Sequence, residues 1–209
     1  MDNDKITVVV TGFGPFGGHT VNASWVAVQE LQKLGLGPDV ELYVHEVPVE
    51  YQTVNSLVPS LWEQYRPQLM VHVGVSGLAT TVTLEKCGHN YGYERLDTSS
   101  FCPDSQCCVE GGPECIHSVI DMDSICKRVT ASGVGVSLSV SKDAGRYLCD
   151  YTYYTSLNLS RGHAAFIHVP PLGKPYSAEE LGRALRAILL EMLEVLSQSQ
   201  GNKHCDHRH

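Results

Sequence analysis

Cys149 is the residue whose surroundings best suit nucleophilic chemistry, although the chain holds eight cysteines. It lies in the stretch SVSKDAGRYLCDYTYYTSL (139–157), in which a strand-like run ends at Ser141, a turn follows at 143–145 and a helical pattern begins. This order places Cys149 in the first two turns of the predicted helix, where backbone N–H groups and the helix dipole stabilise a thiolate. A cysteine inside a helix is more often an inert core residue, so position alone does not make it a nucleophile.

Two further residues could complete a catalytic set with Cys149. His168, in FIHVP, stands near the carboxyl end of the next strand-like run, and a βαβ unit would bring that end beside the start of the helix. Nucleophilic catalysis needs such a base within hydrogen-bond reach of the thiol. Glu85, in TVTLE, could orient the imidazole as the third member of a triad; otherwise it is a solvated carboxylate on a strand. His72, in MVHVG, is a rival base, and either histidine could instead be a hydrogen-bonded core residue.

Strand-like runs alternate with helical patterns along the chain. The runs span 6–13, 40–49, 68–77, 134–141 and 164–172. The helical patterns cover 21–35, 50–65 with an interruption at Pro59, 121–133, and a stretch that starts at the capping box Ser177–Glu180 and continues to Val195. Four of the runs are rich in Val and Ile and end in Gly or Pro, as buried strands of a largely parallel sheet do. The alternation predicts an α/β sandwich with its catalytic groups at the carboxyl ends of the strands.

The length of 209 residues fits one domain. Residues 1–197 are expected to form a single catalytic domain, with a turn-rich excursion at about 88–118. Residues 198–209 read as a polar, His-rich and disordered tail, in which His204, Cys205, His207 and His209 could bind metal only adventitiously.

Composition excludes several partners and sets the compartment. The net charge is −8, from 15 basic and 23 acidic residues, and no Lys/Arg cluster could follow a phosphate backbone, so nucleic acid is not an expected partner. No window approaches the roughly 20 apolar residues of a membrane-spanning helix, and the N-terminus lacks the pattern of a signal peptide. We therefore expect a cytoplasmic protein without a membrane partner, in which the cysteines are thiols.

The segment from Gly12 to Gly17 matches the G-x-G-x-x-G pattern of dinucleotide-binding sites. The context disfavours that function, because Pro15 lacks an N–H and the next helix begins only near Asn22. A turn that presents Phe13 and Phe16 to a strand-end crevice suits a small, flat, uncharged ligand better, although both rings could belong to the core. A phosphate- or nucleoside-binding protein remains a competing function, and it predicts indifference to thiol alkylation.

Several thiols of the excursion lie close together in sequence. They are Cys102, Cys107, Cys108 and Cys115, with His117 nearby. No pair has the Cys-x-x-Cys spacing of a zinc knuckle, so neither a metal site nor a cofactor is predicted. A zinc-stabilised binding module is the third function that stays open.

Four separated motifs carry a family resemblance. They are VTGFGPFGGHTVNASW, TLEKCGHN, DAGRYLCDYTYYTSL and FIHVPPL. In this order they resemble the pyroglutamyl-peptidase I, or pyrrolidone-carboxylate peptidase, family, close to its vertebrate members, and the resemblance extends from Ile6 to about Ser197. The family is one of cytosolic cysteine omega-peptidases that remove an N-terminal pyroglutamate from small peptides.

The resemblance implies a single-domain three-layer α/β/α sandwich around a mostly parallel, mixed sheet, and no cofactor. It also implies that Cys149 is the nucleophile, His168 the general base and acid, and Glu85 the group that holds His168. By the same resemblance Phe13 and Phe16 clasp the pyroglutamate ring. Asn22 matches a family position near the pocket.

Overall fold

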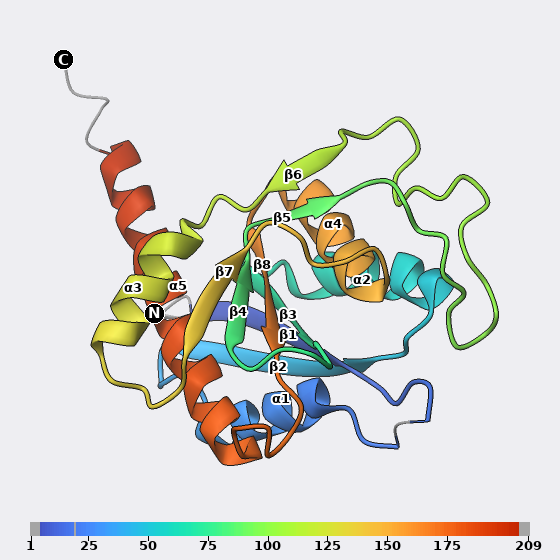
Figure 1. Ribbon diagram of the computed structural model, residues 1–209. Coiled ribbons are helices and arrows are strands. Elements are labelled where there is room, and N and C mark those ends of the chain that lie inside the picture. The colour runs from blue at the N-terminus through green and yellow to red at the C-terminus, as the bar shows by residue number, and fades with distance from the viewer. Residues whose placement is uncertain (1–4, 19, 205–209) are drawn as a thin grey trace.

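The centre of the computed structural model, which describes residues 5–18 and 20–204, is a six-stranded mixed sheet with the order β2-β1-β3-β8-β4-β7 (Figure 1). The strands are β1 (Ile6–Phe13), β2 (Val40–Val47), β3 (Leu69–Val75), β4 (Val82–Glu85), β7 (Leu138–Ser141) and β8 (Ala164–Val169). Strands β2, β1, β3 and β8 are parallel to one another. Strand β4 pairs antiparallel with β8 and parallel with β7, so these two strands run the opposite way. The predicted mixed, mostly parallel sheet is confirmed.

Five helices cover the two faces of this sheet. They are α1 (Ala23–Leu34), α2 (Tyr51–Tyr65), α3 (Met122–Ala131), α4 (Leu148–Ser160) and α5 (Ala178–His204). Helices α1, α3 and α5 pack on one face and α2 and α4 on the other, which gives the predicted three layers (Figure 1). Side chains alternate between the faces along each strand. Val8 and Val10 therefore pack in the core under α1, α3 and α5, and Val9 packs in the core under α2 and α4.

Local sequence signals fix the ends of two helices as predicted. The side chain of Asn22 accepts a hydrogen bond from Ser24 N and caps α1, which ends at Gly35 with a φ of 67°. At the start of α5, Glu180 N donates to Ser177 Oγ, and Ser177 N donates to the Glu180 carboxylate.

Three expectations about the elements are wrong. Helix α2 continues through Pro59, because its buried side chains Tyr51, Val54, Val58 and Leu61 pack firmly enough to outweigh one missing hydrogen bond. Strand β4 was not among the expected runs, and because it reverses direction, β7 and β8 are antiparallel and form no βαβ unit. Helix α5 reaches His204, so residues 198–204 belong to a helix rather than to a tail, while 205–209 lie outside the described residues.

The excursion between β4 and α3 contains a small antiparallel ribbon of two strands, β5 (Cys87–His89) and β6 (Cys115–His117). The ribbon lies against α4, where a Cβ at Gly88 would come within 2.9 Å of the backbone nitrogen of Tyr154. Glycine therefore allows the ribbon to approach the helix closely. The predicted turn-rich excursion is present, and it is attached to the helix that carries Cys149.

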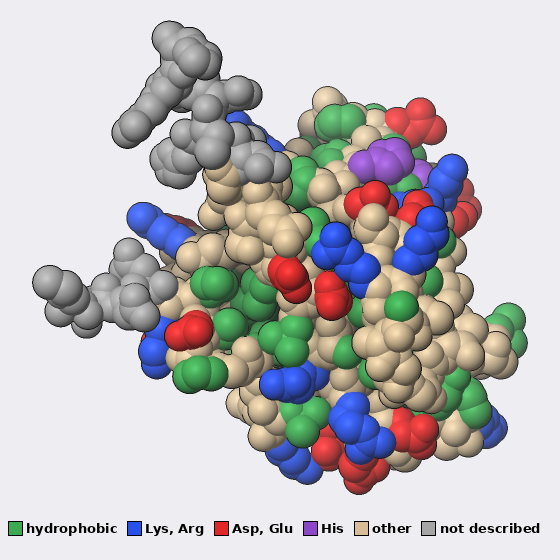
Figure 2. All heavy atoms as spheres, turned by 90° about the vertical axis from the view of Figure 1, so that its left-hand side faces the viewer, with side chains coloured by type: hydrophobic (Ala, Val, Ile, Leu, Met, Phe, Trp, Pro, Cys, Tyr) green, Lys and Arg blue, Asp and Glu red, His purple; other side chains and the backbone are tan. Residues whose placement is uncertain are grey.

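Charges of both signs are mixed on the face that carries α3 and α5, where Lys and Arg side chains stand among Asp and Glu (Figure 2). Within residues 5–18 and 20–204, none of the helices has the length and apolarity needed to cross a membrane.

The glycine-rich segment has a packing role at its start. A Cβ on Gly12 would lie 2.8 Å from the Cα and 3.0 Å from the nitrogen of Trp25, so β1 and α1 are in backbone contact there. The helix begins at Ala23, well after Gly17, so its first N–H groups do not meet the glycines as they would in a dinucleotide site. The competing nucleotide-binding function thus loses its structural basis.

We expect Gly12→Ala to lower the free energy of unfolding by about 1–3 kcal/mol, because the added methyl group meets backbone atoms that cannot rotate away. Thermal and urea unfolding would measure the change. Gly18→Ala is the matched control, since its Cβ meets no atom within 4 Å. Equal stability of the two variants would contradict the close contact between β1 and α1.

Candidate active site

Cys149 lies in the first turn of α4, directly above the end of β8. The helix ends with Arg161 in the left-handed conformation, and Gly162, with a φ of 89°, begins the short return to β8. The reversal makes α4 antiparallel to β8 and brings the start of the helix over the carboxyl end of that strand. Cys149 and His168 are therefore neighbours, as predicted, although an α4–β8 turn achieves this rather than a βαβ unit.

Glu85 reaches His168 because β4 is antiparallel to β8. The register pairs Thr83 with His168 and Glu85 with Phe166, so all four side chains lie on the face covered by α4. His168 Nδ1 donates a hydrogen bond of 2.9 Å to Glu85 Oε1, and both side chains are buried. Tyr153 of α4 holds the end of β4 by donating from its hydroxyl to the carbonyl of Glu85, at 2.9 Å.

The electrostatic environment favours a charged His168. Burial alone lowers the pKa of the imidazole, but three interactions outweigh it: the charge of the Cys149 thiolate, a hydrogen bond with Cys149 and the Glu85 carboxylate. Together they raise the pKa of His168 to about 10. The imidazole can therefore hold a proton at neutral pH and present it toward Cys149.

Gly74 makes room for the thiol. It lies on β3 and pairs with His168, and a Cβ added there would be 2.7 Å from Cys149 Sγ and 2.8 Å from the Phe166 ring. Sequence reasoning missed this residue, although a glycine inside a strand is a signal of close approach.

A cleft of about 610 Å³ opens beside the three residues. Its walls include Phe13, Phe16 and Asn22, as predicted. Phe13 is only 3% exposed and belongs to the core as well as to the cleft wall. Asn22 caps α1 and donates from Nδ2 to the carbonyl of Gly14, and it thereby fixes the loop that carries Phe16. Arg95, from the excursion, also lines the cleft, and its Cζ lies 4.3 Å from the centroid of the Tyr147 ring.

His72, the rival base, is a core residue. Its Nδ1 is 2.6 Å from Thr11 Oγ1 and its Nε2 contacts Ser156 Oγ, so both ring nitrogens are engaged away from the cleft. Complete burial lowers the pKa of His72 to about 3, and the ring is neutral.

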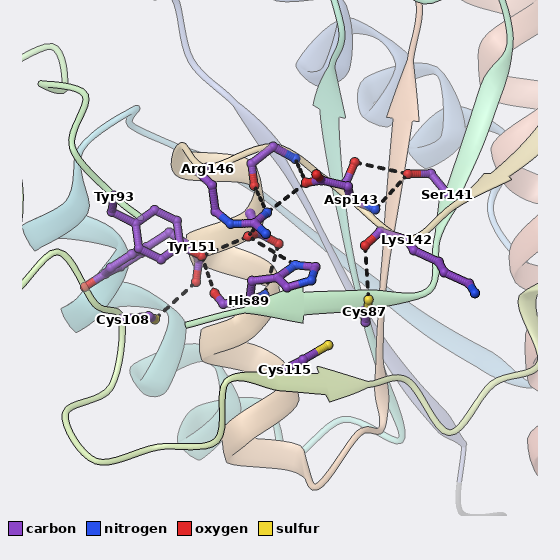
Figure 3. A network of polar contacts seen from close by, with 12 residues as sticks. Cys87, His89, Tyr93, Cys108, Cys115, Ser141, Lys142, Asp143, Arg146 and Tyr151 are labelled. Carbon is purple, nitrogen blue, oxygen red and sulfur yellow. Dashed lines mark hydrogen bonds and ion pairs between the residues drawn. The ribbon is translucent and has the colours of Figure 1, made fainter. Parts of the chain in front are cut away.

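Asp150, a buried carboxylate next to Cys149 in the chain, ties the excursion to α4. Its partners His89, Tyr93 and Arg146 are labelled in Figure 3. Asp150 has no exposed surface and accepts hydrogen bonds from His89 N at 3.2 Å, Tyr93 Oη at 3.1 Å and Arg146 Nη1 at 3.2 Å. Burial raises the pKa of Asp150 to about 7, against the opposing effect of Arg146. Sequence reasoning missed this network because His89 and Tyr93 lie 61 and 57 residues away from Asp150 in the chain.

The cysteine-rich part of the excursion does not form one cluster. Cys108 Sγ lies 3.1 Å from Thr155 Oγ1, and Cys107 contacts Ser105. Only Cys115 and His117 of that group come together. Cys205, His207 and His209 of the His-rich tail, for which only adventitious metal binding is predicted, lie outside the described residues.

We expect Gly74→Ala to slow the alkylation of Cys149 by iodoacetamide by about tenfold or more, because the new methyl group displaces the thiol from His168. Mass spectrometry of the peptide that contains Cys149 would follow the reaction. Gly77→Ala, at the same cleft but with no atom within 4 Å of its Cβ, is expected to react as the wild type does. Wild-type reactivity of folded Gly74→Ala would show that the thiol does not need this space.

We expect Glu85→Gln to lower the pKa of His168. The carboxylate favours the charged imidazole, so its loss should let His168 release its proton at a pH about 1 to 3 lower. An NMR titration of the His168 ring nitrogens would measure this, with exposed Glu41→Gln on β2 as the control. If His168 titrates identically in Glu85→Gln and the wild type, the ion pair does not set its charge.

Comparisons with known proteins identify the family of the chain and agree with its fold. The family model described as pyroglutamyl peptidase matches residues 6–188. The chain is 68% identical to human pyroglutamyl-peptidase 1 over 209 residues, covering 100% of both chains. It is 48% identical over 171 residues to the human pyroglutamyl-peptidase 1-like protein, covering 81% of this chain and 86% of that one.

A solved structure shares the fold at lower identity. The pyrrolidone carboxyl peptidase of Thermococcus litoralis superposes with a TM-score of 0.82 at 21% identity, covering 93% of this chain and 96% of that one. The family match over most of the chain, together with the full-length relative, shows that this chain belongs to the pyroglutamyl peptidase family.

Proposed function

We propose that the protein is a cysteine exopeptidase that hydrolyses the peptide bond after an N-terminal pyroglutamate, with Cys149, His168 and Glu85 as its triad. One observation carries the assignment of the triad: the buried hydrogen bond from His168 Nδ1 to Glu85 Oε1, with Cys149 on the other side of the imidazole. This order, from nucleophile to base to orienting carboxylate, is the arrangement that acyl transfer requires.

In the first half of the reaction the Cys149 thiolate attacks the carbonyl carbon that follows the lactam ring. A C–S bond forms, and the negative charge that develops on the carbonyl oxygen is stabilised by backbone N–H groups in the first turn of α4. The tetrahedral intermediate collapses, the C–N bond breaks, and the leaving nitrogen takes the proton from His168. The shortened peptide departs with a free amino group, and a thioester stays on Cys149.

In the second half, water attacks the thioester carbonyl and gives a proton to the neutral His168. The C–S bond breaks, free pyroglutamate leaves, and the thiolate and imidazolium are restored. Glu85 stays ionised and holds the imidazole in the orientation that faces Cys149 in both halves.

The cleft suits an uncharged ring. A pyroglutamate has a flat lactam with one donor and one acceptor and no charged amino group, and Phe13 and Phe16 offer aromatic faces to it. Asn22 supports this wall through the carbonyl of Gly14, so we assign it a positioning role in substrate binding. The substrates proposed are small peptides, with neither nucleic acid nor a membrane as partner.

We also propose that the protein acts in the cytoplasm. All seven cysteines within the described part of the chain are free thiols, as a reducing compartment requires. Fractionation of cells should recover the protein with cytosolic markers; recovery in the secretory fraction would contradict this location.

The activity is tested by release of a fluorescent amine from a pyroglutamyl amide, with the prolyl amide as the control substrate. We expect turnover of the pyroglutamyl compound alone, abolished by iodoacetamide. Cys149→Ala should lower kcat/KM by about 10³-fold or more. Cys126→Ser, which changes a thiol on α3 outside the cleft, should keep wild-type activity.

Failure would take two distinguishable forms. Turnover that survives in Cys149→Ala would remove the nucleophile but leave the substrate class intact. A folded wild-type protein that cleaves neither amide would overturn the peptidase function itself.

A further inference from the structure

The ribbon of β5 and β6 places two cysteines and two histidines on one face. Its register pairs Cys87 with His117 and His89 with Cys115, so these four side chains project to the same side. Gly88 lies between them in sequence and approaches Tyr154 of α4 on the other side. The sulfur and imidazole groups therefore lie on the side of the ribbon opposite to Gly88. The His89 ring turns toward Asp150, with its Nδ1 3.7 Å from the carboxylate, which leaves Cys87, Cys115 and His117 as a separate group.

Three of these groups are close enough to share one ion. The Sγ atoms of Cys87 and Cys115 and a ring nitrogen of His117 all lie within 4.8 Å of one another, and Cys115 Sγ is 3.9 Å from His117 Nδ1. Figure 3 shows the sulfur of Cys115 directed from β6 toward β5, which carries Cys87. Around a tetrahedral zinc ion such ligand atoms stand about 3.5–3.8 Å apart. A small inward movement of the side chains would complete the geometry.

We propose that Cys87, Cys115 and His117 bind one Zn²⁺ ion, with water in the fourth position. Two thiolates and an imidazole are the ligand types that zinc prefers, and they select it over magnesium or calcium. Both thiols release their protons to solvent when the ion binds. His117 is exposed, so the ion has a path in from solvent and an open position for water.

A disulfide explains this cluster less well than a metal. Cys87 and Cys115 are diagonal rather than opposite in the ribbon, and diagonal residues are about 7–8 Å apart. A disulfide needs Cα atoms about 4.4–6.8 Å apart. Both residues are free thiols in the structure. A disulfide would also leave the imidazole of His117, directly opposite Cys87, without a role, whereas a metal site uses it as a nitrogen ligand.

The ion would clamp the excursion at its base. It would join β5 to β6 across the ribbon, which otherwise has only three paired positions. Without metal, Cys87 donates from Sγ to the carbonyl of Lys142 at 3.3 Å, and the zinc-bound thiolate exchanges this weak hydrogen bond for the bond to the ion. Zinc binding is therefore expected to stabilise the fold without taking part in the proposed hydrolysis.

The test uses the full-length chain with Cys149→Ala, so that the catalytic thiol cannot bind metal. His204, Cys205, His207 and His209 are changed to Ala in the same protein, to remove adventitious ligands. Cobalt(II) is titrated under a non-thiol reductant, and the thiolate-to-cobalt charge-transfer band and the visible bands of tetrahedral cobalt are recorded. Zinc then displaces cobalt in competition with a chromophoric chelator, and the melting temperature is measured with and without zinc.

We expect one equivalent of metal, a thiolate-to-cobalt band and a higher melting temperature with zinc. Cys115→Ser and His117→Ala, which change partly or fully exposed side chains, should each weaken zinc binding by about 100-fold or more and remove the thermal shift. Cys126→Ser is the matched control and should keep both. The proposal is overturned if no thiolate-to-cobalt band forms, or if Cys115→Ser and His117→Ala bind zinc as tightly as the parent protein does.

Discussion

The antiparallel pairing of β4 with β8 is the constraint on which the candidate site depends. In an all-parallel sheet, the carboxyl end of β4 would lie level with the carboxyl end of β8. Here the strands run in opposite directions, and the end of β4 stops beside Phe166, two residues before His168. That offset puts the Glu85 carboxylate behind the imidazole, on the side away from the thiol. The reversed strand thus supplies the proposed orienting group, Glu85, while the parallel strands supply the proposed base, His168, and the space for the Cys149 thiol.

The space for the Cys149 thiol, on the other side of the imidazole, exists because Gly74 has no side chain. Gly74 on β3 leaves room into which Cys149 Sγ descends from α4, and Phe166 fills the rest. Hydrogen bonds to β4 and to the excursion fix the start of α4 above the sheet. Tyr153 reaches down to the backbone of Glu85, and Asp150 reaches outward to the excursion. Consequently the close backbone approach at Gly74 and the buried hydrogen bonds of Tyr153 and Asp150 set the position of the Cys149 thiol.

Much of this could be predicted from the sequence. Val and Ile runs marked the parallel strands, the capping residues marked α1 and α5, and the position of Cys149 at a helix start followed from the turn before it. The proposed triad could be assembled because each of its members stands near the end of an element, where catalytic groups collect in α/β folds. Strand β4 was missed because its four residues give too short a pattern to signal a strand or its direction. The continuity of α2 through Pro59 was missed because tertiary packing decides it. Asp150 and the cluster of Cys87 with His117 were invisible for a related reason: their partners meet only after the excursion folds back on α4.

The attachment of the excursion has a consequence for variation in its length. Residues between β5 and β6 form a loop whose two ends are held together by the ribbon and whose base is fixed to α4 by Asp150. For a loop closed in this way, even a doubling of its length adds only about 0.6 kcal/mol of closure entropy. Insertions at its exposed turns, at Asp104–Ser105 or Glu110–Gly111, would therefore leave the first turn of α4 where it is, while Cys108 between them keeps its contact with Thr155 of that helix. At these two turns new surface can be added while the cleft beside Arg95 keeps its shape.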